Sequence, residues 1–297
     1  MRMTGLTNYE YANTVRFLHC SDVHITGDYK TPSLFALGWR RLPALGELFV
    51  KGRYRNFQRA PETLRQIVRD VDRHHADHLI VSGDLTAYAL EEEFDGARAA
   101  LEPLASDRSR CSIIPGNHDT YTPGTIRDRR FERRFGHLLE SDLPATTREG
   151  PFPFVHLLDG AAVIGLKSAR VPIVPGASFG VIGRRQLEGL DEILKSPELL
   201  GRAVLVVVHH APLTQAGKPD RINHGLVDAD ALLSRLPGPR FAVLHGHIHH
   251  RYHHPATQSR PHIFGAGSST QAGREGYWLI DVRDGQIAAS EMHTPGN

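Results

Sequence analysis

The sequence CSIIPGNHD, residues 111–119, decides how this chain folds and where its chemistry lies. Its first four residues predict a short buried strand, which the following Pro-Gly pair ends. Asn117, His118 and Asp119 then follow at the carboxyl end of that strand, the edge where ligands bind in open α/β sheets. Together an amide, an imidazole and a carboxylate can coordinate metal and donate a proton. By itself the tetrapeptide is better explained as a polar turn, so its interpretation depends on the rest of the chain.

Four further polar clusters also follow strand-like apolar runs. They are Ser-Asp-Val-His at 21–24, Gly-Asp at 83–84, His-His-Ala-Pro at 209–212 and Gly-His-Ile-His at 246–249. In chain order the pattern is Asp-x-His, Gly-Asp, Gly-Asn-His-Asp, His, Gly-His-x-His. This ordered set resembles the calcineurin-like metallophosphoesterase superfamily, and within it the bacterial cyclic-nucleotide phosphodiesterase branch. The resemblance extends from about residue 15 to the last strands.

The chain of 297 residues, 40% of them hydrophobic, suits one large α/β domain. Helices are expected at 61–75, 91–104, 125–135, 183–194 and 228–236, and strands at 15–20, 78–82, 111–114, 152–158, 161–166, 203–208, 241–244, 262–264, 277–282 and 286–291. The last three strands are expected to be antiparallel. We expect a single domain over residues 1–297. The resemblance implies a four-layer α/β/β/α sandwich of two mixed β-sheets flanked by helices.

The resemblance also implies a dinuclear metal centre. A carboxylate can bridge two cations about 4 Å apart and offset their repulsion, and Asp84 matches the bridging position. Metal A would be held by Asp22, His24, Asp84 and His249, and metal B by Asp84, Asn117, His209 and His247. Residues two apart on an extended segment share a face, so one strand end could deliver each Asp-x-His or His-x-His pair. Mixed carboxylate and imidazole ligands favour manganese, iron or zinc over calcium, as two divalent or trivalent ions.

Histidine is abundant, with 19 residues, so several neighbours compete for these roles. Either His209 or His210 could ligate, and the family places the ligand at the first. Four other histidines are expected to be surface residues or to orient a ligand: His245, His250, His253 and His254.

The resemblance assigns the chemistry to an attack on phosphorus by a hydroxide that bridges the two metals. His118 would donate a proton to the leaving oxygen without binding metal. Many relatives carry Asp or Asn three residues after the bridging carboxylate, paired with this histidine, but here that position is Ala87. Asp119 or a residue elsewhere is expected to take that role, and Asp119 is therefore counted with His118 as catalytic.

Composition bears on the binding partners and on the compartment. The formal net charge of +2 gives no argument for nucleic-acid binding. Cys20 and Cys111 lie in strand-like runs, which predicts buried free thiols in a reducing compartment. Residues 1–14 lack an apolar signal region, and no run approaches the ~20 apolar residues of a membrane span. We therefore expect a cytoplasmic protein without a transmembrane segment; the oligomeric state is not predicted.

Residues 25–56 have no clear strand character and are expected to form an insertion beside the site. The stretch 34–55 combines an apolar centre with a basic end. Two interpretations stay open: an excursion packed on the domain, which is slightly favoured, or a cap that meets the substrate or contacts a membrane surface peripherally.

The leading functional hypothesis is a metal-dependent phosphodiesterase acting on a small molecule such as a cyclic nucleotide. One alternative is a pyrophosphohydrolase of a nucleotide-linked lipid such as UDP-diacylglucosamine, which the stretch 34–55 favours and His118 disfavours, since the common form of that enzyme has Arg there. A nuclease is less favoured because the net charge is small. A non-enzymatic scaffold is also less favoured, because every ligand position is filled.

Overall fold

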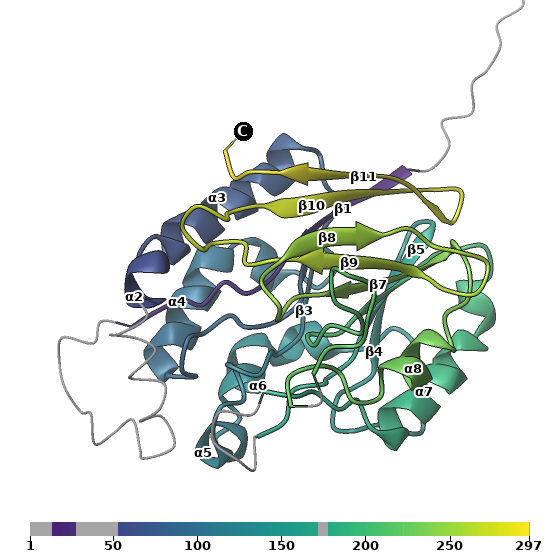
Figure 1. Cartoon of the computed structure of the whole chain (residues 1–297), viewed down its shortest axis with the longest axis horizontal. Helices are drawn as coiled ribbons and strands as arrows, with labels where there is room; N and C mark the ends of the chain where they lie inside the picture. Colours follow the sequence, from purple (N-terminus) through teal and green to yellow (C-terminus); the bar gives the residue numbers. More distant parts are fainter. Residues whose placement is uncertain (1–13, 28–52, 172–177, 222, 297) are drawn as a thin grey trace, which may run out of the picture.

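Two mixed β-sheets packed between helices form the protein (Figure 1). The structure, a computed structural model, describes residues 14–27, 53–171, 178–221 and 223–296. Within these residues the first sheet has the strand order β11-β10-β1-β2-β3, and the second has the order β4-β5-β6-β7-β9-β8. The expected insertion at 25–56, including the stretch 34–55, lies mostly outside the described residues.

Sheet one is built on three parallel strands with an antiparallel hairpin at one edge. Its strands are β1 (Thr14–Cys20), β2 (His78–Val81), β3 (Cys111–Ile113), β10 (Tyr277–Arg283) and β11 (Gln286–His293). β1 pairs parallel to β2 and antiparallel to β10, so the expected antiparallel arrangement of the last two strands is confirmed.

Sheet two has a parallel centre and antiparallel edges. Its strands are β4 (Phe154–Leu158), β5 (Ala161–Gly165), β6 (Ala203–Val207), β7 (Phe241–His245), β8 (Arg251–His254) and β9 (His262–Ala266). The expectation for residues 262–264 was wrong in part, because β9 runs parallel to β7 and antiparallel only to β8. β8 itself was not expected. Its His253 ring stacks on Phe264, with centroids 4.1 Å apart, so burial against an aromatic ring places a polar residue in this edge strand.

Helices cover the outer faces of both sheets. They are α2 (Arg53–Asn56), α3 (Ala60–Arg73), α4 (Glu91–Leu101), α5 (Pro123–Arg127), α6 (Arg130–Phe135), α7 (Arg184–Leu194) and α8 (Ala229–Leu233). The part of the chain that the structure describes also has the short 3₁₀ helices η2 (Leu104–Ser106), η3 (Gly136–Leu139) and η4 (Pro197–Leu199). The single helix expected at 125–135 divides into two, because Arg129 adopts a left-handed conformation with φ of 49°.

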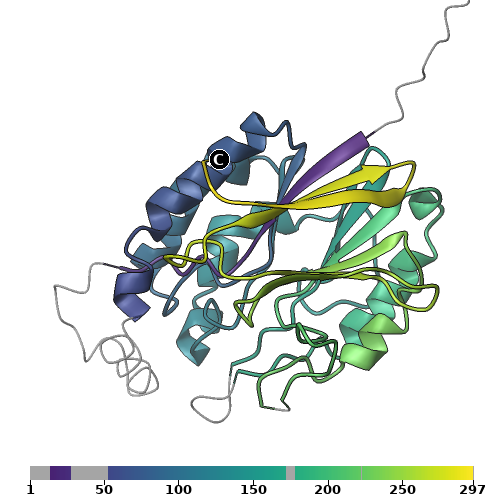
Figure 2. The same cartoon turned by 45° about the horizontal axis from the view of Figure 1, so that its top comes forward.

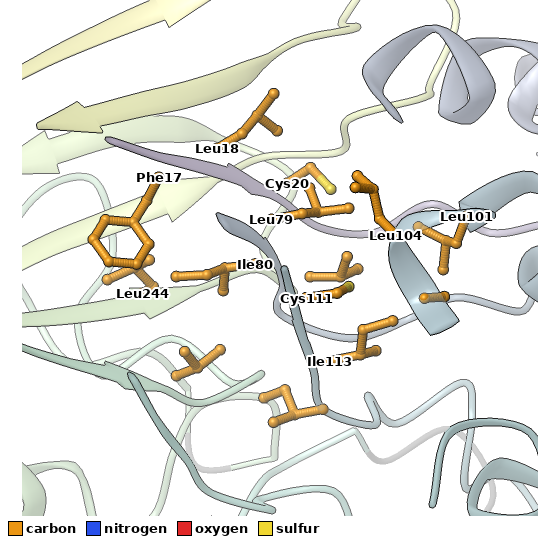
Figure 3. Packing of buried hydrophobic residues seen from close by; sticks show 14 of the residues in the cluster. Phe17, Leu18, Cys20, Leu79, Ile80, Leu101, Leu104, Cys111, Ile113 and Leu244 are labelled. Carbon is orange, nitrogen blue, oxygen red and sulfur yellow. The ribbon is translucent and has the colours of Figure 1, made fainter. Parts of the chain in front are cut away.

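Alternating side chains of sheet two separate two hydrophobic clusters. Val163, Leu205 and Leu244 belong to the cluster shared with sheet one, where Leu244 and Phe17 lie together (Figure 3). Their neighbours in sequence belong to the cluster with α7 and α8: Ile164, Val206 and Val243. The views in Figures 1 and 2 place α3 and α4 on one side of the sheets and α7 and α8 on the other. The expected four-layer sandwich of two mixed sheets is therefore confirmed.

The parallel strands of both sheets end where the polar motifs begin. Residues 21–24 follow β1, Asp84 follows β2, and residues 115–119 follow β3; His209 and residues 246–249 follow β6 and β7. Among the described residues, no helix is long and apolar enough to cross a membrane. Cys20 and Cys111 are both buried free thiols, as expected.

Candidate metal centre

Five of the seven predicted metal ligands have a left-handed backbone, with φ between 51° and 72°. They are Asp22, His24, Asp84, His247 and His249. Such conformations are uncommon outside glycine, and they persist at functional sites where the surrounding structure holds them. The prediction that each Asp-x-His or His-x-His pair lies on an extended segment was wrong. Left-handed residues after the strand ends bring these side chains together instead.

Three motif glycines leave room for the ligands. A Cβ atom on Gly116 would lie 2.1 Å from Asp84 Oδ1, and one on Gly246 would lie 2.2 Å from Asp22 Oδ2. One on Gly83 would lie 2.7 Å from the Nδ1 atom of His209. At these glycines, which precede predicted ligands in the sequence motifs, neighbouring side chains lie too close to the main chain for any residue with a Cβ atom.

The predicted metal-A ligands converge around the Nε2 atom of His24. His249 Nε2 lies 3.3 Å from it, Asp22 Oδ1 lies 3.8 Å from it, and Asp84 Oδ2 lies 3.9 Å from it. His249 Nε2 also lies 3.2 Å from Asp22 Oδ1. We call these four residues the metal-A group; Asp22 and His24 are fully buried, while His249 is partly exposed.

The predicted metal-B ligands meet at the side-chain oxygen of Asn117. His209 Nε2 and His247 Nδ1 each lie 3.0 Å from Asn117 Oδ1. His209 Nε2 also lies 3.3 Å from Asp84 Oδ2. Asn117, His209, His247 and Asp84 form the metal-B group. Asp84 Oδ2 is therefore common to both groups, which suits the bridging position that the family resemblance gives to Asp84.

The residues present fit metal ions. Asp22 Oδ1 is buried and forms no hydrogen bond within the described residues, although His249 is close to it. An unpaired carboxylate oxygen in such a place is costly unless a cation binds it. Carboxylate and imidazole atoms gather within 4.8 Å of one another in three overlapping sets: Asp22, His24 and His249; His24, Asp84 and His118; and Asp22, Asp84 and His209. This donor set suits manganese, iron or zinc.

Electrostatics keep the carboxylates charged. Burial alone would raise the pKa of Asp84, but the nearby imidazoles of His209, His118 and His24 hold that pKa well below its usual range. Burial would likewise raise the pKa of Asp22, and His249 and His209 outweigh it. For His209, burial lowers the pKa, yet the charges of Asp84 and Asp22 raise it to about 9.

Main-chain carbonyls set the orientation of three imidazole rings. His209 Nδ1 donates to Ser82 O at 2.8 Å, and His247 Nε2 donates to His224 O at 2.9 Å. His24 Nδ1 lies 3.3 Å from the carbonyl of Thr86. In the neutral form of each ring the other nitrogen then carries the lone pair and faces the site, as metal-binding histidines require. The sequence could not have indicated these partners, because any residue supplies a carbonyl.

His118 is held by two hydrogen bonds beside the shared carboxylate. Its amide donates to Asp84 Oδ1 at 2.8 Å, and its Nδ1 donates to the carbonyl of Ala87 at 2.7 Å. The side-chain partner absent at position 87 is thus replaced by the main chain of the same residue. This fixes the tautomer of His118 with its proton on Nδ1 in the neutral ring.

Asp119 lies in a different environment from the one expected of a partner to His118. Its Oδ1 accepts from the amide and the hydroxyl of Thr86, at 2.9 and 2.8 Å, and its Oδ2 accepts from the amides of Leu85 and Gly116, at 3.1 and 2.9 Å. The buried carboxylate therefore joins the loops after β2 and β3. Burial and the charge of Asp84 raise its pKa to about 6. The expected contact with the His118 ring is made by Ala87 instead.

His210 faces away from the shared carboxylate. Its Nδ1 lies 2.8 Å from Ser168 Oγ, whereas His209 reaches both Asn117 and Asp84. His245, which precedes the Gly-His-Ile-His motif, contacts Tyr252: the Nε2 atom of His245 lies 2.9 Å from the tyrosine hydroxyl. Of the adjacent pair, His209 is thus the residue placed to ligate.

The chain is similar in sequence or fold to several known proteins. Over 80 residues the chain is 40% identical to a probable cyclic nucleotide phosphodiesterase of Synechococcus sp. (strain WH7803), a match that covers 26% of this chain and only 29% of that protein. The fold is similar to a dimetal phosphatase from Danio rerio, with a TM-score of 0.60 and 13% identity over 95% of this chain and 99% of that one. It is also similar to a purple acid phosphatase from yellow lupin (Lupinus luteus), with a TM-score of 0.54 and 13% identity over 95% of this chain and 54% of that one.

The family model described as calcineurin-like phosphoesterase matches residues 15–251, which is most of the chain. This match spans all five polar motifs and both predicted ligand groups. The resemblance seen in the order of those motifs is therefore confirmed, and the chain belongs to the calcineurin-like phosphoesterase family.

Proposed function

We propose that this protein is a metal-dependent phosphoesterase, and specifically a phosphodiesterase that acts on a small molecule such as a cyclic nucleotide. The observation that carries the proposal is the pair of ligand groups that meet at Asp84 Oδ2, which lies 3.9 Å from His24 Nε2 and 3.3 Å from His209 Nε2. Family membership supports the reaction class, and the partial match to a probable cyclic nucleotide phosphodiesterase supports the substrate class.

The metal-A and metal-B groups would each hold one ion of manganese, iron or zinc, with Asp84 shared between them. When bound, two such ions supply a water of lowered pKa and offset the negative charge of the phosphoryl group. The chain prepares for this by orienting the imidazoles of His209 and His247 through main-chain carbonyls. It also buries Asp22 Oδ1 without a hydrogen bond among the described residues, 3.2 Å from His249 Nε2.

His118 would protonate the leaving oxygen. Because Nδ1 is held by the carbonyl of Ala87, the proton that moves in the reaction is the one on Nε2 of the imidazolium. The ring stands against the His24 ring, with centroids 4.9 Å apart, so it lies beside the metal-A group. The neutral carbonyl orients the ring as a side-chain carboxamide would.

Asp119 would act as a positioning residue. Its carboxylate holds the amides of Leu85 and Gly116, which flank Asp84 and Asn117 in sequence. It therefore fixes the distance between the bridging ligand and a metal-B ligand without touching the reacting groups.

A substrate panel tests the proposed function. Purified protein loaded with Mn²⁺ would be given cyclic nucleotides, bis-p-nitrophenyl phosphate, p-nitrophenyl phosphate and UDP-diacylglucosamine. The proposal expects hydrolysis of the diesters, a cyclic nucleotide preferred, and loss of activity with a chelator. Preference for the monoester or for the lipid-linked diphosphate would overturn the substrate class. No hydrolysis of any of them by metal-loaded protein would overturn the function.

A further inference from the structure

Three consecutive hydroxyl residues, Ser268, Ser269 and Thr270, lie in the loop between β9 and β10 and contact the turn that carries two metal-A ligands. Ser268 Oγ donates to the carbonyl of Asp22 at 2.9 Å, and Thr270 Oγ1 donates to the carbonyl of Val23 at 2.5 Å. Ser269 Oγ accepts from the amide of Ser21 at 3.0 Å. We call these three residues the hydroxyl clamp.

The clamp completes the hydrogen bonding of a strained turn. The turn also bonds to the loop after β2. The amide of Asp22 donates to the carbonyl of Gly83 at 3.1 Å, and the amide of His24 donates to the carbonyl of Asp84 at 2.9 Å. The amide of Ser269 donates to the carbonyl of Ser21 at 2.9 Å. The amides of Asp22 and His24 thus bond to the loop after β2, whereas the amide of Ser21 and the carbonyls of residues 21–23 bond to the clamp. Left-handed residues at Asp22 and His24 persist only while such contacts hold them.

All three clamp residues are buried, with at most 1% of each exposed, so water cannot replace their hydrogen bonds. They also lie beyond residue 251, where the family model ends.

The same loop returns toward α2, since the amide of Ala272 donates to the carbonyl of Asn56 at 2.9 Å. Phe57, next in sequence, packs its ring against the His24 imidazole, with centroids 4.9 Å apart.

We propose that the hydroxyl clamp is a positioning device that sets the metal affinity of the metal-A group. This inference rests on the proposed function, because it assumes that the metal-A group binds an ion. The clamp fixes the main chain at Asp22 and Val23, and this holds the side chains of Asp22 and His24 at the distance from His249 that one ion requires. Among the described residues the clamp forms no hydrogen bond with a metal-B side chain, and that group meets the turn through the His247 amide, which donates to Asp22 Oδ2 at 2.9 Å. The affinity of the metal-B group should therefore depend on the clamp much less.

The test is a calorimetric titration of metal-free protein with Mn²⁺, which measures two binding events in the wild type. Ser268→Ala and Thr270→Val each remove one hydrogen bond with little change in volume. Each should weaken one of the two events about 10–100-fold, the usual cost of losing a partner that orients a metal ligand, and leave the other within about threefold. The conservative variants Ser268→Thr and Thr270→Ser should restore the wild-type affinity, because they keep the hydroxyl.

Ser112→Ala is the matched control. Ser112 is also a buried hydroxyl, bonded to His78 and His156 at 2.7 Å, but it lies in β3 away from the turn. It should lower the melting temperature as the clamp variants do without changing Mn²⁺ affinity. Equal weakening of both events in the clamp variants, or wild-type affinity for both, would overturn the proposal. If Thr270→Val does not fold, the pair Ser268→Ala and Ser268→Thr decides.

The Mn²⁺ titration can fail independently of the test of the proposed function, because the titration uses no substrate. Wild-type protein that binds two Mn²⁺ ions and shows no effect of the clamp variants would refute the clamp alone. Wild-type protein that binds Mn²⁺ but hydrolyses nothing would refute the phosphoesterase and leave the clamp standing.

Discussion

The two halves of the site reach their geometry by different means. In the metal-A group all the ligands have a left-handed backbone: Asp22, His24, Asp84 and His249. In the metal-B group Asp84 and His247 share that conformation, but His209 does not. His209 lies two residues after the end of β6, and its ring is held by the carbonyl of Ser82, which follows β2. The metal-A half therefore depends on contacts that hold a strained turn, whereas the metal-B half depends largely on how the two sheets pack.

This difference predicts which substitutions should impair metal binding in one half and which in both. Asp84 belongs to both groups, so removing its carboxylate should impair both halves. Asp84→Ala is expected to lose both bound ions and to reduce kcat/KM by at least roughly 10²–10³-fold, the cost of removing one electrostatic stabiliser. Metal analysis and diester hydrolysis measure this. Two ions per chain with normal turnover in this variant would show that the bridge is misassigned.

His118 lies beside the metal-A half but should not bind its ion. His118→Ala is expected to keep both ions and lose roughly 10²–10⁴-fold in kcat. The loss should be smaller for bis-p-nitrophenyl phosphate, whose leaving group needs little protonation.

Ala87→Gly is the control for this variant, because it keeps the carbonyl that holds Nδ1 and should retain activity. An equal loss with good and poor leaving groups would remove His118 from the role of acid.

Two glycines allow each half to be disturbed separately. Gly246→Ala would push on Ser21 and Asp22 and should weaken the metal-A ion, whereas Gly83→Ala would push on His209 and on the main chain of Gly116 and should weaken the metal-B ion. Each is expected to weaken one Mn²⁺ binding event about 10–100-fold. Gly160→Ala is the control, because Gly160, like Gly83, has a positive φ but has nothing within 4 Å of the added Cβ. Identical profiles for the first two variants would mean that the halves are not independent.

The expected effect with the smallest step, about tenfold per pH unit, is on the pH dependence of metal binding. In the metal-free protein the pKa of His209 is raised to about 9, so below that pH an ion must displace a proton. Affinity at the metal-B group should therefore rise about tenfold per pH unit from roughly pH 7 to 9. The stability of the metal-free fold should change with pH in the opposite direction. Protonated His209 stabilises the fold fully below the pKa that this histidine has in the unfolded chain, and this stabilisation is lost as the pH rises to about 9. Mn²⁺ affinity that is constant over this range would contradict the prediction.

Much of the fold followed from the sequence, because apolar runs and amphipathic periods mark strands and helices directly. β8 did not, since its histidines carry no strand signal, and the stacking of His253 on Phe264 and His262 arises only in the folded sheet. The predicted ligands lie together in the structure, and their roles stay predictions. The residues that support them were not predicted.

The reason is physical. The carbonyl of Ala87 orients His118, and no side-chain pattern encodes a main-chain acceptor. The hydroxyls of Ser268 and Thr270 meet Asp22 and Val23 from some 246 or 247 positions away, a contact that only the folded sheets create.

The central claim is that Asp84 joins two metal-binding halves. A crystal structure of protein grown with Mn²⁺, with anomalous scattering recorded at the manganese edge, tests it most directly. The account predicts two anomalous peaks, one among Asp22, His24 and His249 and one among Asn117, His209 and His247, with Asp84 coordinating both. A single peak, or two peaks that do not share Asp84, would contradict it.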